Sequence, residues 1–312
     1  MNPFRFGVSV WHAPSRAEWI AKARKIEDLG YSSLMLPDHL LTERVAPMPA
    51  LISAAEATKR ILVGTYVLNN DLRHPVLLAR EAAAVDLLTD GRLQLGLGAG
   101  WNKAEYDQAG LTFDRGGIRV ERLAEAVVII RRLLAGEQVT FAGRHYQVSG
   151  HVIAPLPVQK PHLPILIGGK GRRLLTVAAQ QADIVGLTGM TFRRGGTELD
   201  NSGWTGSAVD ECIALIRAAA TEERFARLEL NTLVQRVVVS DDRRGAVEAL
   251  NRVWPQLSAA DILENPYVLV GTVDQIVQDL CARRARWGIS YYVVHEPYMD
   301  AFAPVVTRLA GQ

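Results

Sequence analysis

Short apolar runs alternate with amphipathic segments along almost the whole chain. The runs are rich in Val, Ile and Leu and are continuously apolar, which is typical of strands that are covered on both faces. The segments between them carry apolar residues at helical spacing. We predict eight strands, at residues 4–10, 32–37, 61–68, 93–100, 163–169, 183–189, 228–240 and 290–297.

A helix is predicted after each strand, and several helix ends carry recognisable signals. Ser15 and Glu18 form a capping-box pair at the start of the first helix, and Gly30 ends it. Thr272 and Gln275 form a second capping box. Other helices are predicted over 50–60, 75–92, 116–135, 171–181, 206–224, from about 242, and in the C-terminal segment, with a proline-interrupted linker before residue 271.

This β-then-α order predicts a (β/α)8 TIM barrel, and we interpret residues 1–312 as one domain. Two insertions, at about 139–153 and 188–204, interrupt the alternation of strands and helices. The first predicts a hairpin that turns at Ala142 and Gly143, and the second is a polar, glycine-rich loop. We expect both at the C-terminal face of the barrel, where active-site loops lie, and the second to act as a mobile lid.

An open, doubly wound sheet is the competing α/β architecture. Gly96, Gly98 and Gly100 follow a predicted strand, as glycines do in a dinucleotide-binding turn. That fingerprint needs its third glycine three residues after the second, where this chain has Trp101. The barrel therefore remains the prediction.

Composition and charge exclude several classes of function. Hydrophobic residues make up 48% of the 312 residues, and the formal net charge is only +2, with 35 basic and 33 acidic residues. This balance gives no support for binding to nucleic acid or to an anionic membrane. The sequence has no signal peptide and no apolar run of the roughly 18 residues that a membrane span needs. Cys212 and Cys281 lie far apart in apolar-periodic stretches, so we expect a soluble, cytoplasmic protein without a disulfide.

Polar and aromatic residues follow the predicted strands, at positions that a barrel places around its mouth. They include no trio of metal ligands, no nucleophile elbow and no cysteine, so we predict no metal site and no hydrolytic chemistry. Aromatics, amides and glycines instead suit a flat cofactor with a polar tail. Structural roles stay open for several of them: Asp38 as a helix cap, His39 in an ordinary turn, Trp11 and Trp101 in packing. The candidates are Trp11, His12, Asp38, His39, Asn69, Asn70, Asp71, Gly100, Trp101, Gly169, Lys170, Gly171, His295 and Glu296.

A second kind of signal lies in the stretch GGKGRR. Gly168, Gly169 and Gly171 lead from a strand into a helix, and Lys170 and Arg172 stand beside them. Small residues let the backbone approach an anion, and N–H groups at a helix start point toward it. We interpret the stretch as a phosphate site. The alternative is a tight turn that needs glycines for its dihedral angles.

The chain resembles the bacterial luciferase-like family of flavin and deazaflavin enzymes. The resemblance rests on the segments PDH, GTYVLNNDLRHPVLLAREAAAVDLLTDGRLQLGLGAGW and PILIGGKGRRLLTVAAQQADIVGL. More narrowly, it is similar to the branch that uses the deazaflavin coenzyme F420. The resemblance implies an oxidoreductase that moves a hydride between coenzyme F420 and a small organic substrate, and a homodimer. An FMN-dependent monooxygenase using reduced flavin and oxygen is the alternative, and a non-catalytic flavin-binding protein is a third interpretation.

Roles for individual residues also follow from the resemblance. His39 would contact or protonate near the reactive part of the ring and so be catalytic, and Asp38 would hydrogen-bond the ring system. A bulge in the third strand, with a cis peptide bond between Tyr66 and Val67, would press on the back of the ring, with Asn69 nearby. The glycine-rich stretch would hold the cofactor's phosphate.

One departure from the family pattern concerns the position after the strand-four glycines. Sugar-phosphate dehydrogenases of the deazaflavin branch carry an acidic glutamate there, whereas this chain has Trp101, which we place with Gly100 against the cofactor. An indole cannot supply that proton, and it suggests a more apolar substrate. His295 and Glu296 are candidate replacements by position, and together with Trp11 they are predicted to line the substrate site.

Overall fold

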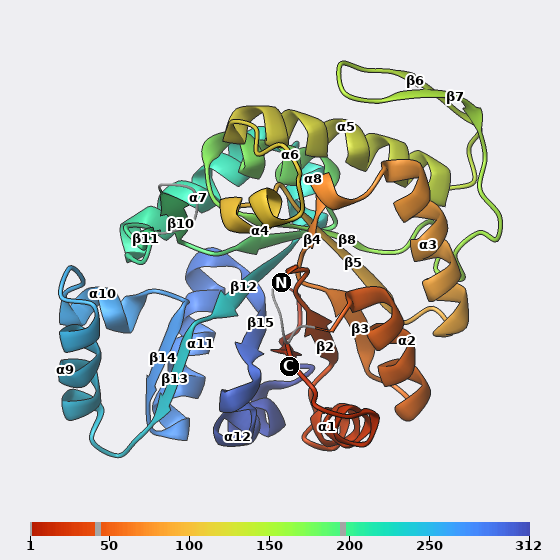
Figure 1. Ribbon diagram of the computed structural model, residues 1–312. Helices are drawn as coiled ribbons and strands as arrows, with labels where there is room; N and C mark the ends of the chain where they lie inside the picture. The colour runs from red at the N-terminus through yellow and green to blue at the C-terminus, as the bar shows by residue number, and fades with distance from the viewer. Residues whose placement is uncertain (1, 41–44, 194–197) are drawn as a thin grey trace.

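The strands close into a parallel barrel in the computed structural model, which describes residues 2–40, 45–193 and 198–312 (Figure 1). The barrel strands are β1 (Arg5–Ser9), β2 (Ser33–Leu36), β3 (Leu62–Thr65) with β4 (Leu68–Asn69), β5 (Leu93–Gly98), β8 (Ile165–Gly169), β9 (Ile184–Leu187), β12 (Glu229–Val234) and β15 (Ile289–His295). Their order is β3-β2-β1-β15-β12-β9-β8-β5, and pairing of β3 with β5 closes the ring. The predicted (β/α)8 barrel is confirmed.

Helices surround this ring of strands (Figure 1). They are α1 (Arg16–Asp28), α2 (Pro47–Ala57), α3 (Pro75–Leu88), α4 (Lys103–Gln108), α5 (Gly116–Leu134), α6 (Arg172–Gln181), α7 (Gly206–Ala219), α8 (Glu222–Arg227), α9 (Arg243–Val253), α10 (Ala259–Glu264), α11 (Val273–Trp287) and α12 (Met299–Leu309), with short 3-10 turns η1 (Asn70–Leu72) and η3 (Glu296–Tyr298). The capping box of Thr272 and Gln275 is confirmed, and the Ser15 hydroxyl accepts the Glu18 N–H as expected. In the described part of the chain, no helix has the length and apolar character needed to cross a membrane.

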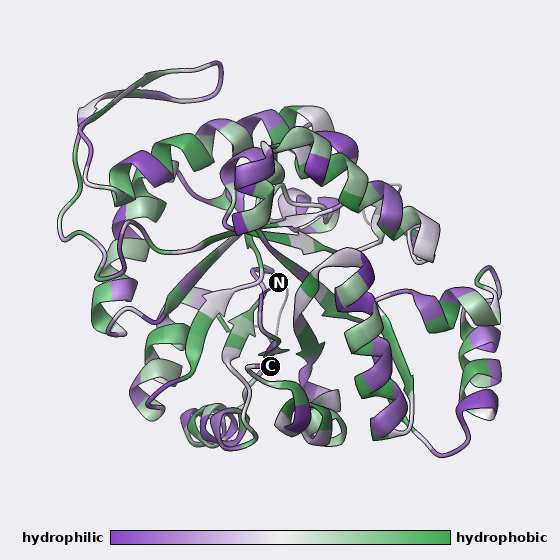
Figure 2. Cartoon of the chain, turned by 180° about the vertical axis from the view of Figure 1, so that it is seen from behind, coloured by the Kyte–Doolittle hydropathy of each residue, from purple (hydrophilic) through white to green (hydrophobic). Residues whose placement is uncertain are grey.

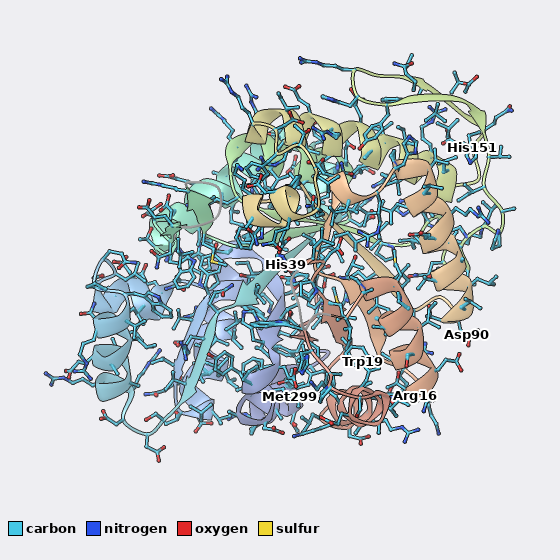
Figure 3. All side chains as sticks on the ribbon, in the orientation of Figure 1. Arg16, Trp19, His39, Asp90, His151 and Met299 are labelled. Carbon is cyan, nitrogen blue, oxygen red and sulfur yellow. The ribbon has the colours of Figure 1, made fainter. Side chains whose placement is uncertain are left out.

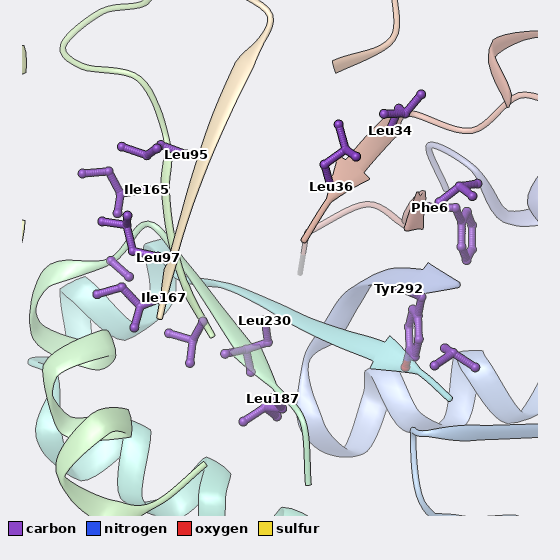
Figure 4. Packing of buried hydrophobic residues seen from close by; sticks show 14 of the residues in the cluster. Phe6, Leu34, Leu36, Leu95, Leu97, Ile165, Ile167, Leu187, Leu230 and Tyr292 are labelled. Carbon is purple, nitrogen blue, oxygen red and sulfur yellow. The ribbon is translucent and has the colours of Figure 1, made fainter. Parts of the chain in front are cut away.

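The barrel wall separates two apolar layers, because successive strand residues point to opposite faces. Outward-facing residues such as Leu34 and Phe6 belong to one large core with the helices (Figure 4). Phe6 meets Phe302 of α12 edge-on in this core. Figure 2 shows the matching hydropathy, with mainly apolar strands and helices that alternate between apolar and polar residues. A separate cluster fills the barrel interior: Met35, Leu166, Ile184, Tyr291 and Val293.

The segment before α11 differs from its prediction. The expected strand 228–240 is two strands, β12 in the barrel and β13 outside it, and the expected linker contains both α10 and a further strand, β14. With α9 and α10 these two strands form a small lobe beside the barrel (Figure 1). The apolar run VVV of β13 follows closely after β12 and conceals the break between them. Similarly, the helix expected over 206–224 is split into α7 and α8 by Thr221, which caps α8. The strands outside the barrel are β6 (Val139–Ala142), β7 (Gln147–His151), β10 (Thr191–Arg193), β11 (Glu198–Asp200), β13 (Arg236–Val239) and β14 (Val268–Gly271).

The predicted hairpin is formed by β6 and β7. It starts after α5, at the N-terminal end of the barrel strands, and folds back over α5 (Figure 1). The Glu125 carboxylate accepts the backbone N–H groups of Arg144, His145 and Tyr146 at 2.8–3.1 Å. The Tyr146 hydroxyl accepts from Asn70 Nδ2 at 3.3 Å. The turn of the hairpin therefore reaches the C-terminal rim of the barrel.

The second insertion follows β9 and so lies at the C-terminal face. Its described part forms the short β10–β11 pair, while residues 194–197 of the predicted lid lie outside the described residues. Trp204 packs against Trp254 and Tyr267 of the neighbouring lobe. Asn201 Oδ1 also accepts from Gln256 at 2.6 Å, so the described part of this loop rests on that lobe.

Candidate functional site

The floor of the barrel mouth is built where the third barrel position is interrupted. β3 ends at Thr65, the peptide bond between Tyr66 and Val67 is cis, and the chain re-enters the sheet as β4. The side chain of Val67 lies over strand glycines: a Cβ on Gly98 would be 2.6 Å from Val67 Cγ2, and one on Gly168 would be 3.3 Å from Cγ1. These glycines therefore make room for Val67 inside the barrel.

Tyr66 reaches across the barrel. Its hydroxyl donates to Asn231 Oδ1 at 2.5 Å, and Asn231 Nδ2 donates to the Tyr291 carbonyl at 3.1 Å. Burial raises the pKa of Tyr66 well above its ordinary value, so the phenol keeps its hydrogen for this bond. Tyr66 and Val67 together cover the interior apolar cluster and give the mouth a fixed floor.

Asp38 lies just past β2 and is buried. Its Oδ2 accepts from Arg73 Nη1 at 2.5 Å and from the Asn69 N–H at 3.2 Å, and its Oδ1 accepts from Arg73 Nη2 at 3.3 Å. Asp38 therefore ties the end of β2 to the turn after β4. A contact between Asp38 and a cofactor ring stays a prediction.

His39 pairs with a carboxylate that comes from a distant part of the chain. Its Nδ1 lies 2.7 Å from Glu105 Oε1, and the Trp101 indole stands edge-on to the imidazole with 5.6 Å between ring centroids. The Glu105 side chain is 4% exposed and also accepts from Asn102 Nδ2 at 3.0 Å, whereas the His39 side chain is 20% exposed. Figure 3 places His39 near the centre of the circle of helices. The pair therefore combines a buried carboxylate with an imidazole that reaches the barrel mouth.

Tyr106 follows Glu105 and anchors the same short helix, α4. Its hydroxyl lies 3.0 Å from Asn69 Oδ1 and 3.0 Å from Asp71 Oδ2, on the turn after β4. Gly100 has a φ of +72°, and a Cβ there would lie 2.2 Å from the Tyr106 hydroxyl and 2.6 Å from Asn69 Oδ1. Gly100 is therefore needed for the packing of Tyr106, in addition to any contact with a cofactor.

The glycine-rich stretch connects β8 to α6, as predicted. Gly169 and Gly171 have φ values of +153° and +103°, and Gly171 occupies the N-cap of α6 without a side-chain cap. Lys170 Nζ lies 3.4 Å from Ser202 Oγ in the loop after β9, and Arg172 is exposed in the first turn of α6. Backbone N–H groups, glycines and cations at one helix start fit a phosphate group.

The three residues predicted to line a substrate site are divided between two places. Trp11 and His295 meet edge-on, with 5.1 Å between ring centroids, and His295 Nε2 lies 3.4 Å from Gln235 Oε1. Glu296 forms an ion pair with Lys22 of α1 at 2.6 Å instead. The structure thus brings Trp11 and His295 together at the barrel rim, and turns Glu296 toward α1.

Comparison with known families shows to which family the chain belongs. The family model described as luciferase-like monooxygenase matches residues 2–291. The chain belongs to the luciferase-like monooxygenase family. Among its relatives, it is 31% identical over 308 residues to an F420-dependent glucose-6-phosphate dehydrogenase of Beutenbergia cavernae, covering 89% of this chain and 86% of that protein. It is 29% identical over 273 residues to an F420-dependent hydroxymycolic acid dehydrogenase of Mycobacterium tuberculosis, covering 83% and 69%.

One further relative is matched over only part of its length. The chain spans 48% of an F420-dependent glucose-6-phosphate dehydrogenase of Microbacterium testaceum, to which it is 34% identical over 164 residues. Among solved structures, it resembles the F420-dependent tetrahydromethanopterin reductase of Methanopyrus kandleri (TM-score 0.74, 17% identity, 99% and 98% coverage). It also resembles an F420-dependent secondary alcohol dehydrogenase (TM-score 0.76, 18% identity, 99% of both chains). At these identities the structural likeness shows the common fold.

The sequence did not indicate which side chains bind the predicted site residues. Glu105, Tyr106 and Arg73 each bind a predicted site residue, yet they stand far from it in the chain or look like ordinary helix and loop positions. The available signal was Asn102, which caps α4 and predicts a short helix directly after the strand-four glycines. In residues 2–40, 45–193 and 198–312, no three His, Cys, Asp or Glu side chains are grouped to hold a metal ion.

Proposed function

We propose that this luciferase-like protein is an oxidoreductase that uses the deazaflavin coenzyme F420 and acts on an apolar alcohol or its carbonyl counterpart. The observation that carries the proposal is the placement of His39, whose imidazole reaches the barrel mouth while a buried carboxylate holds one of its nitrogens. The printed names of the relatives, which are F420-dependent dehydrogenases, support the choice of cofactor.

The cofactor would be held by two parts of the mouth. The floor made by Tyr66 and Val67 would meet the ring, because both side chains pack on the interior apolar cluster and would offer an apolar surface to a flat molecule. The start of α6 would hold the phosphate through its uncapped N–H groups. We assign to the ring Asp38, Tyr66, Val67, Asn69, Gly100 and Trp101, and to the phosphate Gly168, Gly169, Lys170, Gly171 and Arg172.

The protein's own part in the chemistry is to orient the substrate, exclude water and handle a proton. When bound, the cofactor supplies the acceptor or donor of the hydride. His39 holds or takes the proton of the substrate oxygen, a role that suits imidazole near neutral pH. Glu105, rather than Glu296, supplies the carboxylate beside this histidine, since Glu296 is paired with Lys22.

An apolar, uncharged substrate fits the rim. Trp11 and Trp101 are each 38% exposed and offer flat apolar surfaces. Arg73, on the turn after β4, is already paired with the Asp38 carboxylate. This arrangement favours a hydrophobic alcohol over a sugar phosphate, whose phosphate would need a cation of its own.

The test is turnover with purified protein and oxidised coenzyme F420. A series of secondary alcohols of increasing apolar size is compared with glucose 6-phosphate, and loss of the oxidised cofactor's visible absorbance is followed. We expect reduction of the cofactor with apolar alcohols and none with the sugar phosphate. Oxygen consumption with reduced FMN, without turnover of coenzyme F420, would instead assign an FMN-dependent monooxygenase. Binding without any turnover would indicate a flavin-binding protein.

A further inference from the structure

We propose that Glu105 is a positioning residue, which holds His39 with its ring hydrogen on Nδ1 and so leaves Nε2 as the proton acceptor at the barrel mouth. The inference rests on the proposed function, because it makes His39 the base in alcohol oxidation. Nothing in the family match or in the names of the relatives assigns a role to Glu105.

The contact with an ionised Glu105 favours one tautomer of His39. His39 Nδ1 and Glu105 Oε1 are 2.7 Å apart, which is a normal length for a charge-assisted hydrogen bond. An ionised carboxylate can only accept, so Nδ1 must carry the hydrogen. In a neutral imidazole the other nitrogen, Nε2, is then the acceptor. The bond therefore selects one of the two neutral forms of His39.

Glu105 is itself held from several sides, so it can orient the ring rather than follow it. Asn102 Nδ2 donates to Glu105 Oε1 at 3.0 Å, and the Glu105 side chain is 4% exposed. The next residue, Tyr106, fixes α4 to Asn69 on the turn after β4. The Trp101 indole stands against the imidazole and restricts its rotation. The carboxylate is thus a fixed point to which the histidine is tied.

The tautomer matters because only one form of His39 can accept a proton at the mouth. In alcohol oxidation the substrate O–H bond breaks and its proton goes to Nε2 of His39, while that bond's electrons form the second carbon–oxygen bond. The carbinol C–H bond would break at the same time, and the deazaflavin, when bound, would supply the acceptor for the hydride and its two electrons. With hydrogen on Nε2 the ring could only donate, and it could not act as the base.

The alternative is that the contact merely fastens α4 to the segment after β2. A structural contact of this kind would change stability without changing the tautomer. We therefore compare Glu105→Gln with Asp107→Asn, which makes the same carboxylate-to-amide change on α4 but in an exposed pair with Lys103. The His39 signals are identified by their loss in His39→Gln.

The first measurement uses the cofactor-free protein, at a pH at which the imidazole is neutral. The ¹⁵N chemical shifts of the ring nitrogens report which nitrogen carries the hydrogen. We expect the Nδ1–H form to dominate in the wild type and in Asp107→Asn, and the Nε2–H form to rise in Glu105→Gln. A dominant Nε2–H form in the wild type, or unchanged His39 shifts in Glu105→Gln, would overturn the inference. Should Glu105→Gln fail to fold, the wild-type tautomer and Glu105→Asp still decide the question.

The second measurement uses coenzyme F420 and an alcohol that the wild type oxidises. We expect kcat to fall at least about tenfold in Glu105→Gln with little change in KM, and to recover in part in Glu105→Asp. A changed tautomer with unchanged kcat would overturn the role of Glu105 and leave the proposed function standing. A wild type that does not turn over coenzyme F420 would remove the proposed function, and the tautomer result would still report on Glu105 by itself.

Discussion

The two ends of the barrel interior are filled in opposite ways. At the N-terminal end the inward side chains are large and bind one another. Arg5 donates to Glu229 at 2.7 Å and to Gln94 at 3.1 Å, and its guanidinium carbon lies 4.4 Å from the centre of the Tyr291 ring. The Tyr291 hydroxyl in turn lies 2.6 Å from the Ser33 hydroxyl. These side chains fill that end of the barrel and bind one another through hydrogen bonds and an ion pair.

At the C-terminal end, glycines occupy three strand positions beside the floor made by Tyr66 and Val67. They are Gly98, Gly168 and Gly186, and the candidate site residues stand just beyond the strand ends. His39 and Trp101 face one another there. The N-terminal (closed) end of the barrel thus holds large, paired side chains, and the C-terminal (open) end holds the proposed proton-handling group.

The largest effect is expected at the open end. His39→Ala should lower turnover about a hundredfold or more, since it would remove the proposed proton acceptor, while cofactor binding stays close to wild type. The control is His151→Ala, because His151 lies on β7 of the hairpin, far from His39 in Figure 3. Steady-state kinetics and calorimetry check both parts. Wild-type turnover in His39→Ala would remove His39 from the mechanism.

The matching change at the closed end should affect stability alone. Arg5→Met leaves the Glu229 carboxylate buried without its cation, and we expect the free energy of unfolding at pH 7 to fall by about 3 kcal/mol with turnover per folded molecule unchanged. The control is Arg227→Met, which breaks an exposed pair and should cost well under 1 kcal/mol. Equal effects of the two changes would contradict the role given to the closed end.

This variant also makes a prediction about pH. Burial raises the pKa of Glu229 above its ordinary value of 4.5 although Arg5 opposes the rise, so removal of Arg5 should raise the pKa further. A raised carboxyl pKa favours the folded state at low pH, and that advantage is lost as the pH rises through the folded-state pKa. The deficit of Arg5→Met should therefore shrink between pH 7 and pH 4, as urea unfolding at both values will show.

Gly100→Ala tests whether packing around Gly100 also holds Tyr106 and Asn69 in place at the C-terminal end of the barrel. The new Cβ would displace the Tyr106 hydroxyl and Asn69, at a position whose positive φ already strains an alanine. We expect a loss of about 1–2 kcal/mol in stability and a smaller loss of turnover than in His39→Ala. Adding Tyr106→Phe should return part of the stability, because it removes one clashing atom. Additive losses in the double variant would argue against this clash.

The smallest effect is expected outside both ends, in the hairpin. Burial disfavours the ionised form of Glu125, but hydrogen bonds from His145, Arg144 and Tyr146 outweigh it and hold the pKa of the carboxyl below 4.5. The stabilisation is therefore present above pH 4.5 and lost as the pH falls through the lowered pKa. Glu125→Gln should cost less than about 1 kcal/mol at neutral pH and weaken this acid dependence. Glu137→Gln, on an exposed ion pair with Arg132, is the control, and an equal response in both would contradict the role of Glu125.

Most of the fold could be predicted because its signals are local. Apolar runs and amphipathic helices alternate regularly along the chain. The lobe built on β13 and β14 could not be predicted, since a strand that leaves a barrel has the same apolar pattern as one that stays. The position of the hairpin turn depends on Glu125, which lies 19 to 21 residues before the backbone groups that it binds. Hydrophobic periodicity gives no information on such a contact.

Candidate site residues could be chosen from their positions after the strands, but the side chains that bind them could not be predicted. His39 was chosen because it follows a strand, whereas its link to Glu105 joins positions 66 residues apart. The Arg73 contact likewise shows that Asp38 is held by the protein itself. Such pairs arise from the closure of the barrel, which brings consecutive strand ends together, and no local pattern encodes which side chains then touch.

Titration of the purified protein with oxidised coenzyme F420 and, separately, with FMN is the most direct test of the proposed cofactor, with binding followed by cofactor fluorescence. We expect coenzyme F420 to bind with a Kd of about 1 μM or tighter and FMN to bind much more weakly. Preference for FMN, or binding of neither cofactor, would contradict the assignment of the open end of this barrel to a deazaflavin.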